Sequence, residues 1–493
     1  MPKGAPSSLY RLAARRPSLV AKEARHRTIF SFVIDTDPKF AYQGYHLARS
    51  LIENCGAEAS AVHAQCTPEV SPATRRLFAG LGCTLHDAPR VGDGRYCNKV
   101  GQLDNLLAHD FGRAVLLDTD MIAVADLRPY LGGAALQAKP VDLSNPSLDA
   151  LEEVAWRAGM PKLPPRIATD AEDAETYLGN CNGGLYAIPK ALCPEVAAAW
   201  RHWTLWLLAN ADPLAREGKE AHLDQVAMWL VINMGQIPFQ AAPSNINYFT
   251  HMATEHRHLD PSREIALLHY HDVSLNMLGL LEPPIPLNCA EKTAIAKANR
   301  QIGCGFENYS FWDLRYSSCG ERGSGVGSRG DSLTYKRVLL REQGAEQAKS
   351  VLDFGCGDLE VVKILDLKGY LGLDSSERAI RVAQCARPDW AFERLAFGNS
   401  HGPIPPKHLV ICFEVLIHQP TRRAYQSIIK FLADHTLETL IVSGYDSADR
   451  IRRPNHMLFF HEPLEASLQR TGRFRSIRRI GAHTDVVIVR CDT

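Results

Sequence analysis

The sequence predicts an α/β protein built from two doubly wound domains. A chain of 493 residues is longer than one hydrophobic core usually serves. Short β-branched and apolar runs alternate with amphipathic helical stretches, first near the N-terminus and again from Ser350 onward. We therefore expect a basic tail at residues 1–28, a first domain at 29–285, a linker at 286–304 and a second domain at 305–493.

The first alternation predicts a largely parallel sheet. Expected strands are Thr28–Ile34, Ala59–Ala64 and Ala114–Leu117, and expected helices are Tyr45–Glu53, Pro72–Leu81 and Cys97–His109. Pro161–Ala174 is rich in proline, alanine and acidic residues and is expected to be a loop.

The second alternation predicts an independent sheet. Expected strands are Ser350–Phe354, Tyr370–Leu373, His408–Phe413 and Thr439–Ser443, followed by a hairpin of Phe474–Ile480 and Val486–Cys491. Expected helices are Leu359–Leu365, Glu377–Cys385 and Arg422–Ala433.

Charge and hydropathy exclude several classes of protein. The 55 basic residues balance 55 acidic ones, which argues against a general affinity for nucleic acid. The longest apolar run, Val226–Ile232, is far short of the roughly 18 residues that cross a bilayer. We expect a cytoplasmic protein with at most peripheral contact, through its basic tail, with the inner face of the membrane. The 13 cysteines form no C-x-x-C pair, which favours reduced thiols over structural zinc.

A first candidate site comes directly after the strand Ala114–Leu117. Asp118 and Asp120 are separated by one residue, so their carboxylates can converge on one divalent cation. Such a cation would bridge the phosphates of a nucleotide diphosphate. The alternative is a turn at a strand end with solvated acids.

The surrounding segment, Arg113–Leu127, resembles the D-x-D segment of GT-A-fold glycosyltransferases, especially family eight, the glycogenin and bacterial galactosyltransferase group. Asp37–Ser50 is similar to the turn that holds the nucleotide base in that group, and Tyr96–Lys99 to the helix start near the D-x-D loop. The resemblance implies a GT-A-like domain that binds a nucleotide diphosphate sugar, most naturally a UDP-sugar. Its expected contacts are Asp37, Phe40, Lys99, Asp118 and Asp120.

Later motifs of the same group occur in order. Asn182-Gly183-Gly184 resembles the turn lining the sugar pocket, and Asp224-Gln225 matches an Asp-Gln pair, which implies catalytic roles for Asn182, Asp224 and Gln225. His269-Tyr270 implies His269 as a third ligand, beside Asp118 and Asp120, of Mn²⁺ or Mg²⁺, with His271 as the rival ligand. We expect the remaining nearby histidines at the surface: His251, His256 and His258. Asp272 stands where the group has glycine, so the group's phosphate contacts and stereochemistry are not carried over.

A second candidate site comes after the strand at Ser350. Gly355 and Gly357 permit positive φ and a close ligand, and Asp374 ends the next strand, where a carboxylate can bind ribose hydroxyls. Glu360 takes the place of the third glycine of a dinucleotide fingerprint, so a pyrophosphate turn is not supported.

Val351–Gly357 resembles the cofactor turn of class I S-adenosylmethionine-dependent methyltransferases. His408–Gln419 is similar to their fourth strand with the following helix, and Tyr316–Arg329 to a glycine-rich lid. The resemblance implies a Rossmann-like domain with S-adenosyl-L-methionine as cofactor. The implied cofactor-binding residues are Asp353, Gly355, Gly357, Asp374, Gly325, Arg329 and Glu414. We expect His418 to be the catalytic base, against the alternative of a histidine that packs and bonds to the backbone.

Together the two sites predict a bifunctional enzyme. It would transfer a sugar to a glycan or lipid-linked oligosaccharide and O-methylate a sugar hydroxyl, in bacterial surface polysaccharide or glycolipid synthesis. The first alternative is a methyltransferase with a non-catalytic, sugar-binding N-terminal domain. A third hypothesis is a scaffold without turnover.

Overall fold

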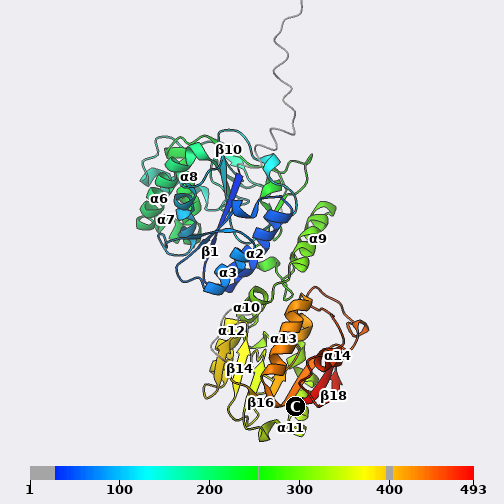
Figure 1. The fold of residues 1–493 in the computed structure, drawn as a ribbon. Helices are drawn as coiled ribbons and strands as arrows, with labels where there is room; N and C mark the ends of the chain where they lie inside the picture. Colours follow the sequence, from blue (N-terminus) through cyan, green and yellow to red (C-terminus); the bar gives the residue numbers. More distant parts are fainter. Residues whose placement is uncertain (1–27, 254, 396–403) are drawn as a thin grey trace, which may run out of the picture. The chain divides into compact units, whose positions relative to one another are not determined.

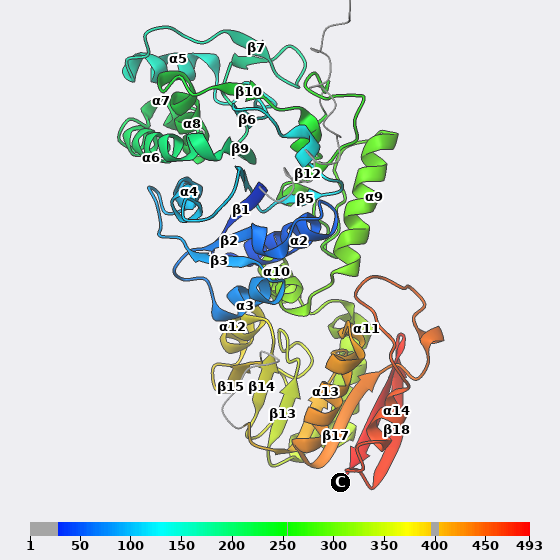
Figure 2. The ribbon, with the colours of Figure 1, turned by 45° about the horizontal axis from the view of Figure 1, so that its top comes forward.

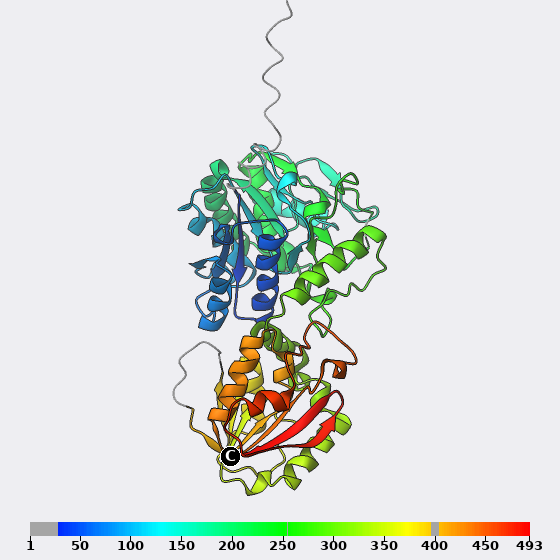
Figure 3. The ribbon, with the colours of Figure 1, turned by 45° about the vertical axis from the view of Figure 1, so that its right-hand side comes forward.

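The computed structural model describes residues 28–253, 255–395 and 404–493, so the expected basic tail lies outside the described residues except for Thr28. The chain forms two compact units, Met1–Gln301 and Ile302–Thr493. Figures 1 to 3 show the ribbon from three directions.

The first unit contains a seven-stranded sheet in the order β10-β6-β9-β4-β1-β2-β3. Only β9 runs antiparallel to its neighbours, and all other pairs are parallel. The strands are β1 (Thr28–Ile34), β2 (Val62–Cys66), β3 (Thr84–Asp87), β4 (Arg113–Leu117), β6 (Leu136–Ala138), β9 (Leu185–Pro189) and β10 (Phe239–Ala241). A three-stranded sheet joins β11 (Tyr248–Phe249), β12 (Leu267–His269) and β5 (Met121–Ala123), and a hairpin joins β7 (Arg166–Ala168) and β8 (Glu175–Tyr177).

Helices cover both faces of the larger sheet. They are α2 (Pro38–Glu53), α3 (Pro72–Gly80), α4 (Gln102–Leu106), α5 (Leu148–Arg157), α6 (Cys193–Ala209), α7 (Asp212–Ala215) and α8 (Leu223–Met234). One core joins Phe30 and Phe32 of β1 to Leu47 of α2. The other joins Leu116 of β4 to Trp200 of α6 and to α8. Because alternate residues of β1 and β4 enter opposite cores, these two strands are buried on both faces.

The second unit contains a seven-stranded sheet in the order β15-β14-β13-β16-β17-β19-β18. Its strands are β13 (Val351–Phe354), β14 (Leu371–Asp374), β15 (Ala391–Arg394), β16 (Lys407–Cys412), β17 (Thr436–Gly444), β18 (Ser476–His483) and β19 (Val486–Asp492). Its helices are α10 (Asn308–Cys319), α11 (Gly330–Glu342), α12 (Glu377–Ala386), α13 (Arg422–Asp434) and α14 (Leu464–Gln469). The pairs from β15 to β17 are parallel, and β19 runs antiparallel to both of its neighbours.

The strand order reverses between β13 and β16. From β13 the chain moves outward to β14 and β15, then returns to place β16 on the other side of β13. In open parallel sheets, ligands bind in the crevice at the carboxyl ends of the strands at such a switch point. The Gly355–Gly357 turn comes after β13 at this end of the sheet.

Several expectations about local structure are wrong. Leu359–Leu365 forms turns and no helix, and a right-handed helix cannot start at its first residue because Leu359 has a positive φ of 61°. The expected loop Pro161–Ala174 contains β7, which pairs with β8. The expected helix Cys97–His109 starts as the 3-10 turn η3 (Tyr96–Gly101), and α4 ends at Leu106.

The stretch expected to link the domains is largely helical, since α9 (Cys289–Cys304) occupies most of residues 286–304. In the described part of the chain, no helix is both long and apolar enough to pass through a membrane.

Candidate functional site

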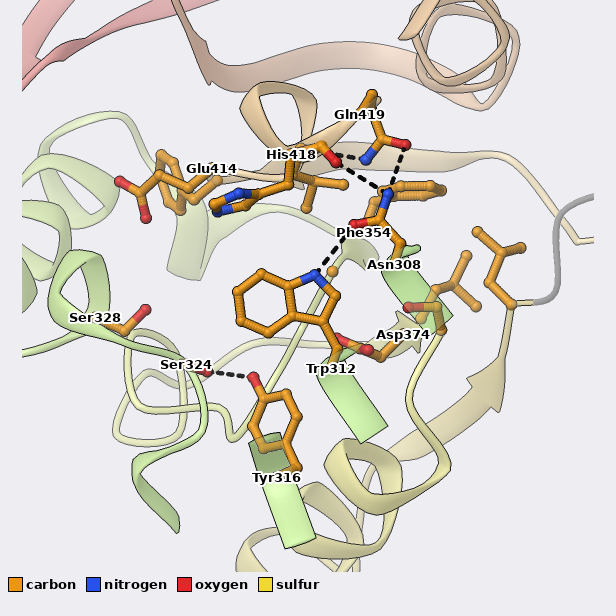
Figure 4. A pocket seen from close by; sticks show the side chains of 16 residues that line it. Asn308, Trp312, Tyr316, Ser324, Ser328, Phe354, Asp374, Glu414, His418 and Gln419 are labelled. Carbon is orange, nitrogen blue, oxygen red and sulfur yellow. Dashed lines mark hydrogen bonds between the residues drawn. The ribbon is translucent and has the colours of Figure 1, made fainter. Parts of the chain in front are cut away.

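A cavity of about 150 Å³ opens at the switch point of the second unit. Figure 4 shows its lining side chains, which come from α10, the glycine-rich segment before α11, and the carboxyl ends of β13, β14, β15 and β16 with the residues that follow them. They are Asn308, Trp312, Tyr316, Ser324, Ser328, Phe354, Gly355, Leu373, Asp374, Ser375, Leu395, Phe413, Glu414, Val415, His418 and Gln419.

The turn after β13 accepts only glycine at two positions. Gly355 and Gly357 have φ of 79° and 53°, a region that other residues adopt at a cost. A Cβ on Gly355 would lie 2.2 Å from Cγ2 of Val415, and a Cβ on Gly357 would lie 2.4 Å from Oγ of Ser324. The bare backbone of this turn therefore forms one wall of the cavity.

Asp374 holds the same turn from β14. One of its carboxylate oxygens accepts the N–H of Gly357 at 3.0 Å, and the other accepts the N–H of Ser376 at 2.9 Å. Burial raises the pKa of Asp374 to about 6. Asp353, expected to bind cofactor, lies behind the turn: it is buried, accepts the Tyr370 hydroxyl at 2.8 Å and is not part of the lining. Asp353 is in β13, two residues before Gly355, and its side chain is buried.

The glycine-rich segment Gly320–Gly330 is folded against the glycine turn. It contains the 3-10 turns η9 (Gly320–Arg322) and η10 (Val326–Ser328). The Tyr316 hydroxyl and Ser324 Oγ are 2.6 Å apart, and Arg329 forms an ion pair with Asp358. Ser324 and Ser328 line the cavity, whereas Gly325 and Arg329, the expected contacts, support the segment from outside the lining.

Glu414 presents one free carboxylate oxygen. Its Oε2 accepts the Lys336 ammonium, and Lys336, fully buried, also donates to the Gly327 carbonyl at 2.7 Å. Burial lowers the pKa of Lys336 although Glu414 opposes the shift. Oε1 of Glu414 is buried without a hydrogen-bond partner among the described residues. A buried acceptor without a partner costs free energy, so this oxygen is suited to a donor on a ligand.

His418 bonds to the backbone, as the alternative interpretation of the sequence expects, and it also lines the cavity. Its Nδ1 lies 2.9 Å from the Met457 carbonyl, which fixes the proton on Nδ1 and leaves the lone pair on Nε2. Burial lowers the pKa of His418, with the Met457 carbonyl opposing. The ring lies 5.1 Å from the Trp312 indole, and in Figure 4 both rings are part of the cavity wall.

Sequence reasoning missed the contribution of α10. Asn308, Trp312 and Tyr316 all line the cavity. Asn308 donates to the His418 carbonyl at 2.9 Å and accepts the Trp312 indole N–H at 3.2 Å. Their spacing of four residues places the three side chains on one helix face, a signal that was present in the sequence.

In the first unit, a cavity of about 440 Å³ lies at the carboxyl ends of β1 and β4. All five expected nucleotide-sugar contacts line it: Asp37, Phe40, Lys99, Asp118 and Asp120. Asp37 also caps α2 by accepting the Lys39 N–H at 3.0 Å. Asp272 lines the cavity too, paired with Lys39 at 2.9 Å and with the Gln43 amide at 2.8 Å.

Lys99 is held between two carboxylates. Its ammonium lies 2.8 Å from Asp118 and 3.3 Å from Asp224. Burial opposes the charge of Lys99, but Asp118 and Asp224 raise its pKa overall. Burial raises the pKa of Asp224 to about 6 in spite of Lys99. Asp118 thus faces a fixed positive charge.

Asp120, His269 and His271 form the group that can hold a cation here, with ligand atoms within 4.8 Å of one another. His269 Nε2 is 3.3 Å from Asp120 Oδ1, and its Nδ1 is 2.9 Å from Oδ1 of Asn247, which orients the ring. His269 and His271, the alternative third ligands expected from the sequence, both lie beside Asp120. Asp118, the other expected ligand, is paired with Lys99. His251, expected at the surface, lies with its ring 4.0 Å from His271.

The other expected catalytic residues surround this group without lining the cavity. Asn182 Oδ1 accepts the Gly184 N–H and the Asn247 amide, each at 2.9 Å. Gln225 bonds His222 at 2.9 Å. A Cβ on Gly183 would lie 2.9 Å from Cγ of Gln225, so this glycine lets the loop pack on α8.

No family model and no curated protein matches the sequence. Among solved structures, magnesium protoporphyrin IX methyltransferase from Synechocystis PCC 6803, with bound SAH, is 19% identical and covers 37% of this chain and 97% of its own, with a TM-score of 0.31. The N-methyltransferase NodS from Bradyrhizobium japonicum WM9 is 17% identical and covers 33% of this chain and 85% of its own, with a TM-score of 0.26. Similarities of this size carry no weight for function, which is inferred from the geometry of the two cavities.

Proposed function

We propose that the second unit is an S-adenosylmethionine-dependent methyltransferase. The observation that carries this proposal is the glycine turn at the switch point, with Asp374 beside it and Glu414, one of whose carboxylate oxygens is buried without a partner among the described residues, in the cavity lining. A nucleoside fits the glycine turn and Asp374, because its ribose hydroxyls can bond to a carboxylate and its close approach to the turn requires backbone without side chains. The ammonium group of an amino acid fits the Glu414 carboxylate.

Each end of this cofactor has a counterpart in the cavity. Asp374 would take the ribose hydroxyls, and Leu373 and Leu395 offer an apolar wall to the adenine. Oε1 of Glu414 would accept the ammonium of the methionine end, with Ser324 and Ser328 closing over it. When bound, the cofactor supplies a methyl group on a sulfonium, an electrophile that needs positioning more than activation.

His418 would serve an acceptor hydroxyl. Its Nε2 takes the hydroxyl proton as the oxygen–methyl bond forms and the sulfur–methyl bond breaks, which leaves a neutral thioether. The Met457 carbonyl fixes the tautomer that can do this. Trp312 offers the acceptor a flat apolar face next to the base.

The direct test is calorimetric titration of the full chain with S-adenosylmethionine and S-adenosylhomocysteine. We expect one molecule bound per chain, and loss of binding in Asp374→Ala, with Asp389→Ala, an exposed residue of the same unit, as the matched control. Absence of binding to the wild-type chain, or binding of a nicotinamide dinucleotide in its place, would refute the proposal.

A second function is favoured by the cavity of the first unit, a metal-dependent nucleotide-sugar transferase. Asp120, His269 and His271 supply one oxygen and two nitrogen donors, a set that suits Mn²⁺. The orientation of His269 by Asn247 supports this fit. A bound cation would neutralise a diphosphate leaving group.

Hydrolysis of UDP-sugars by the full chain tests this function. We expect turnover that needs Mn²⁺ and is lost in Asp120→Asn but kept in the exposed control Asp110→Asn. Binding of UDP-sugar without any turnover would favour the sugar-binding module.

Two transferases on one chain would suit consecutive steps on one glycan, within bacterial surface polysaccharide or glycolipid synthesis. The support is the presence of both cavities in a single chain. If methylation proceeded equally well on acceptors that lack the newly added sugar, the two steps would not be consecutive.

A further inference from the structure

The first unit carries a second group of metal-ligating side chains, separate from the Asp120 group. β2 and β3 are adjacent parallel strands, seen in Figure 2, and Gln65 of β2 pairs with His86 of β3. Since side chains two residues apart share a face of a strand, His63 lies on the same face as Gln65 and His86. His109 comes after α4, which lies against β1 on this side of the sheet.

The three imidazoles are in mutual contact. His63 Nδ1 and His86 Nε2 are 2.8 Å apart. The His109 ring lies edge-on to both, with centroids 4.8 Å from His63 and 5.2 Å from His86. One ring nitrogen from each residue lies within 4.8 Å of the others.

The surrounding polar groups hold this arrangement in place. Gln65 Nε2 donates to Ser31 Oγ at 3.1 Å and to the Gln102 carbonyl at 2.9 Å. Gln65 Oε1 accepts the Asn105 amide at 2.8 Å, which fixes α4 over β2. Lys190 donates to the His109 carbonyl at 2.7 Å. The backbone on each side of the three rings is thereby fixed.

The rings of His63 and His86 are suited to stay neutral. Burial, together with the neighbouring His86 and His109, lowers the pKa of His63 to about 3. Burial likewise lowers the pKa of His86, with His109 acting in the same direction and Asp87 opposing. Asp87 is itself paired with Arg75 at 2.7 Å. A neutral imidazole keeps the lone pair that a metal ion requires.

We propose that His63, His86 and His109 bind a divalent transition metal ion, with Zn²⁺ as the ion that the donor set fits best. Three imidazoles without a carboxylate favour zinc over magnesium or calcium. His63 is buried, but His86 and His109 are half-buried, so a fourth position faces solvent and is open to water. Tetrahedral ligands at roughly 2.05 Å from zinc lie about 3.3 Å apart, so small ring rotations suffice.

The ion would cross-link β2, β3 and the segment after α4. The proposed zinc site does not depend on either transferase function, because none of its three histidines lines either cavity.

Zinc titration of the full chain tests the proposal. The chain is stripped with a chelator and carries Asp120→Asn and His271→Gln, which remove the other ligand group. Against a competing chromophoric chelator, we expect one equivalent of zinc to bind. Adding His86→Gln and His109→Gln should weaken binding at least 100-fold. Adding His202→Gln, on an exposed residue of α6, should leave it unchanged.

Cobalt gives a second measurement that needs no further variant. Cobalt bound by three imidazoles in the Asp120→Asn, His271→Gln background should produce visible d–d absorption that zinc displaces. The proposal is overturned if this background binds no zinc or cobalt. It is equally overturned if a folded His86→Gln, His109→Gln chain binds zinc as tightly as the background does.

Discussion

Among single residues, Gly355 is the one on which the proposed nucleoside site after β13 depends most directly. We expect Gly355→Ala to weaken S-adenosylhomocysteine binding at least tenfold, because the new Cβ would meet Val415 at 2.2 Å and displace it from the cavity wall. Calorimetric titration measures the change. Gly472→Ala is the matched control: its φ is also positive, at 63°, but nothing lies within 4 Å of a Cβ there. Both variants carry a strain of about 1–2 kcal/mol, so equal losses of affinity would contradict the prediction.

If His418 is the base of the proposed methyltransferase, it sets the pH dependence of methyl transfer. Burial lowers the pKa of His418 below its ordinary value of 6.5, so the neutral base dominates at neutral pH and is lost as the pH falls through the folded-state pKa. We expect the rate to fall on the acid side with a midpoint under 6.5. His418→Gln should lower kcat about 100-fold and abolish this acid limb. The rate of S-adenosylhomocysteine formation from about pH 5 to about pH 9 measures both.

The control for His418→Gln is cofactor affinity, which should stay within about threefold of wild type if the residue acts on the acceptor proton. A parallel loss of cofactor binding would assign His418 to packing alone.

At the scale of elements, β13 and β14 bury two carboxyl groups beneath the cofactor turn. Burial raises the pKa of Asp353 to about 7, with the Tyr370 hydrogen bond opposing, whereas an unfolded aspartate titrates near 3.9. The folded state therefore holds a proton that the unfolded state releases. This stabilisation is complete below about pH 4 and is lost as the pH rises toward about 7.

The free energy of unfolding of the wild-type chain should fall between about pH 5 and about pH 8. We expect this fall to be roughly 2 kcal/mol smaller in Asp353→Asn. Urea unfolding of the full chain at both pH values, with the second unit's transition identified by its shift with S-adenosylhomocysteine, measures the difference. Asp449→Asn, on an exposed residue, should keep the wild-type slope. An unchanged slope in Asp353→Asn would contradict the assignment.

Helices and strands with strong apolar periodicity were predicted correctly. The prediction failed where the conformation of a single residue interrupts the element. β1 and α13 match their apolar patterns closely, and the closing hairpin of β18 and β19 lies where it was expected. The stretch after Gly357 has helical periodicity, but the left-handed Leu359 breaks it. Nothing in the identity of a leucine signals positive φ, because residues with a branched side chain rarely adopt it.

At the scale of the whole molecule, two compact units predict two unfolding events. We expect calorimetry to resolve two transitions, one raised by S-adenosylhomocysteine and the other by UDP with Mn²⁺. Ligand at about 100 times its Kd adds about 2.7 kcal/mol, which corresponds to a rise of roughly 5–10 °C for units of this size. Asp120→Asn should abolish only the second rise. One transition that moves with both ligands would show that the units unfold together.

Local signals in the amino-acid chain were enough to determine the α/β class, because strand and helix periodicity are read within short segments. The expected domain bounds and the binding role of the glycine turn and Asp374 stay predictions. Folding in three dimensions decided the partner of each carboxylate in the D-x-D pair. Asp118 pairs with Lys99, 19 residues earlier, and Asp120 with His269, from a strand far along the chain. The assembly of His63, His86 and His109 likewise depends on strand register and on where α4 ends. Contacts of this kind arise from packing between distant segments, which residue patterns do not encode locally.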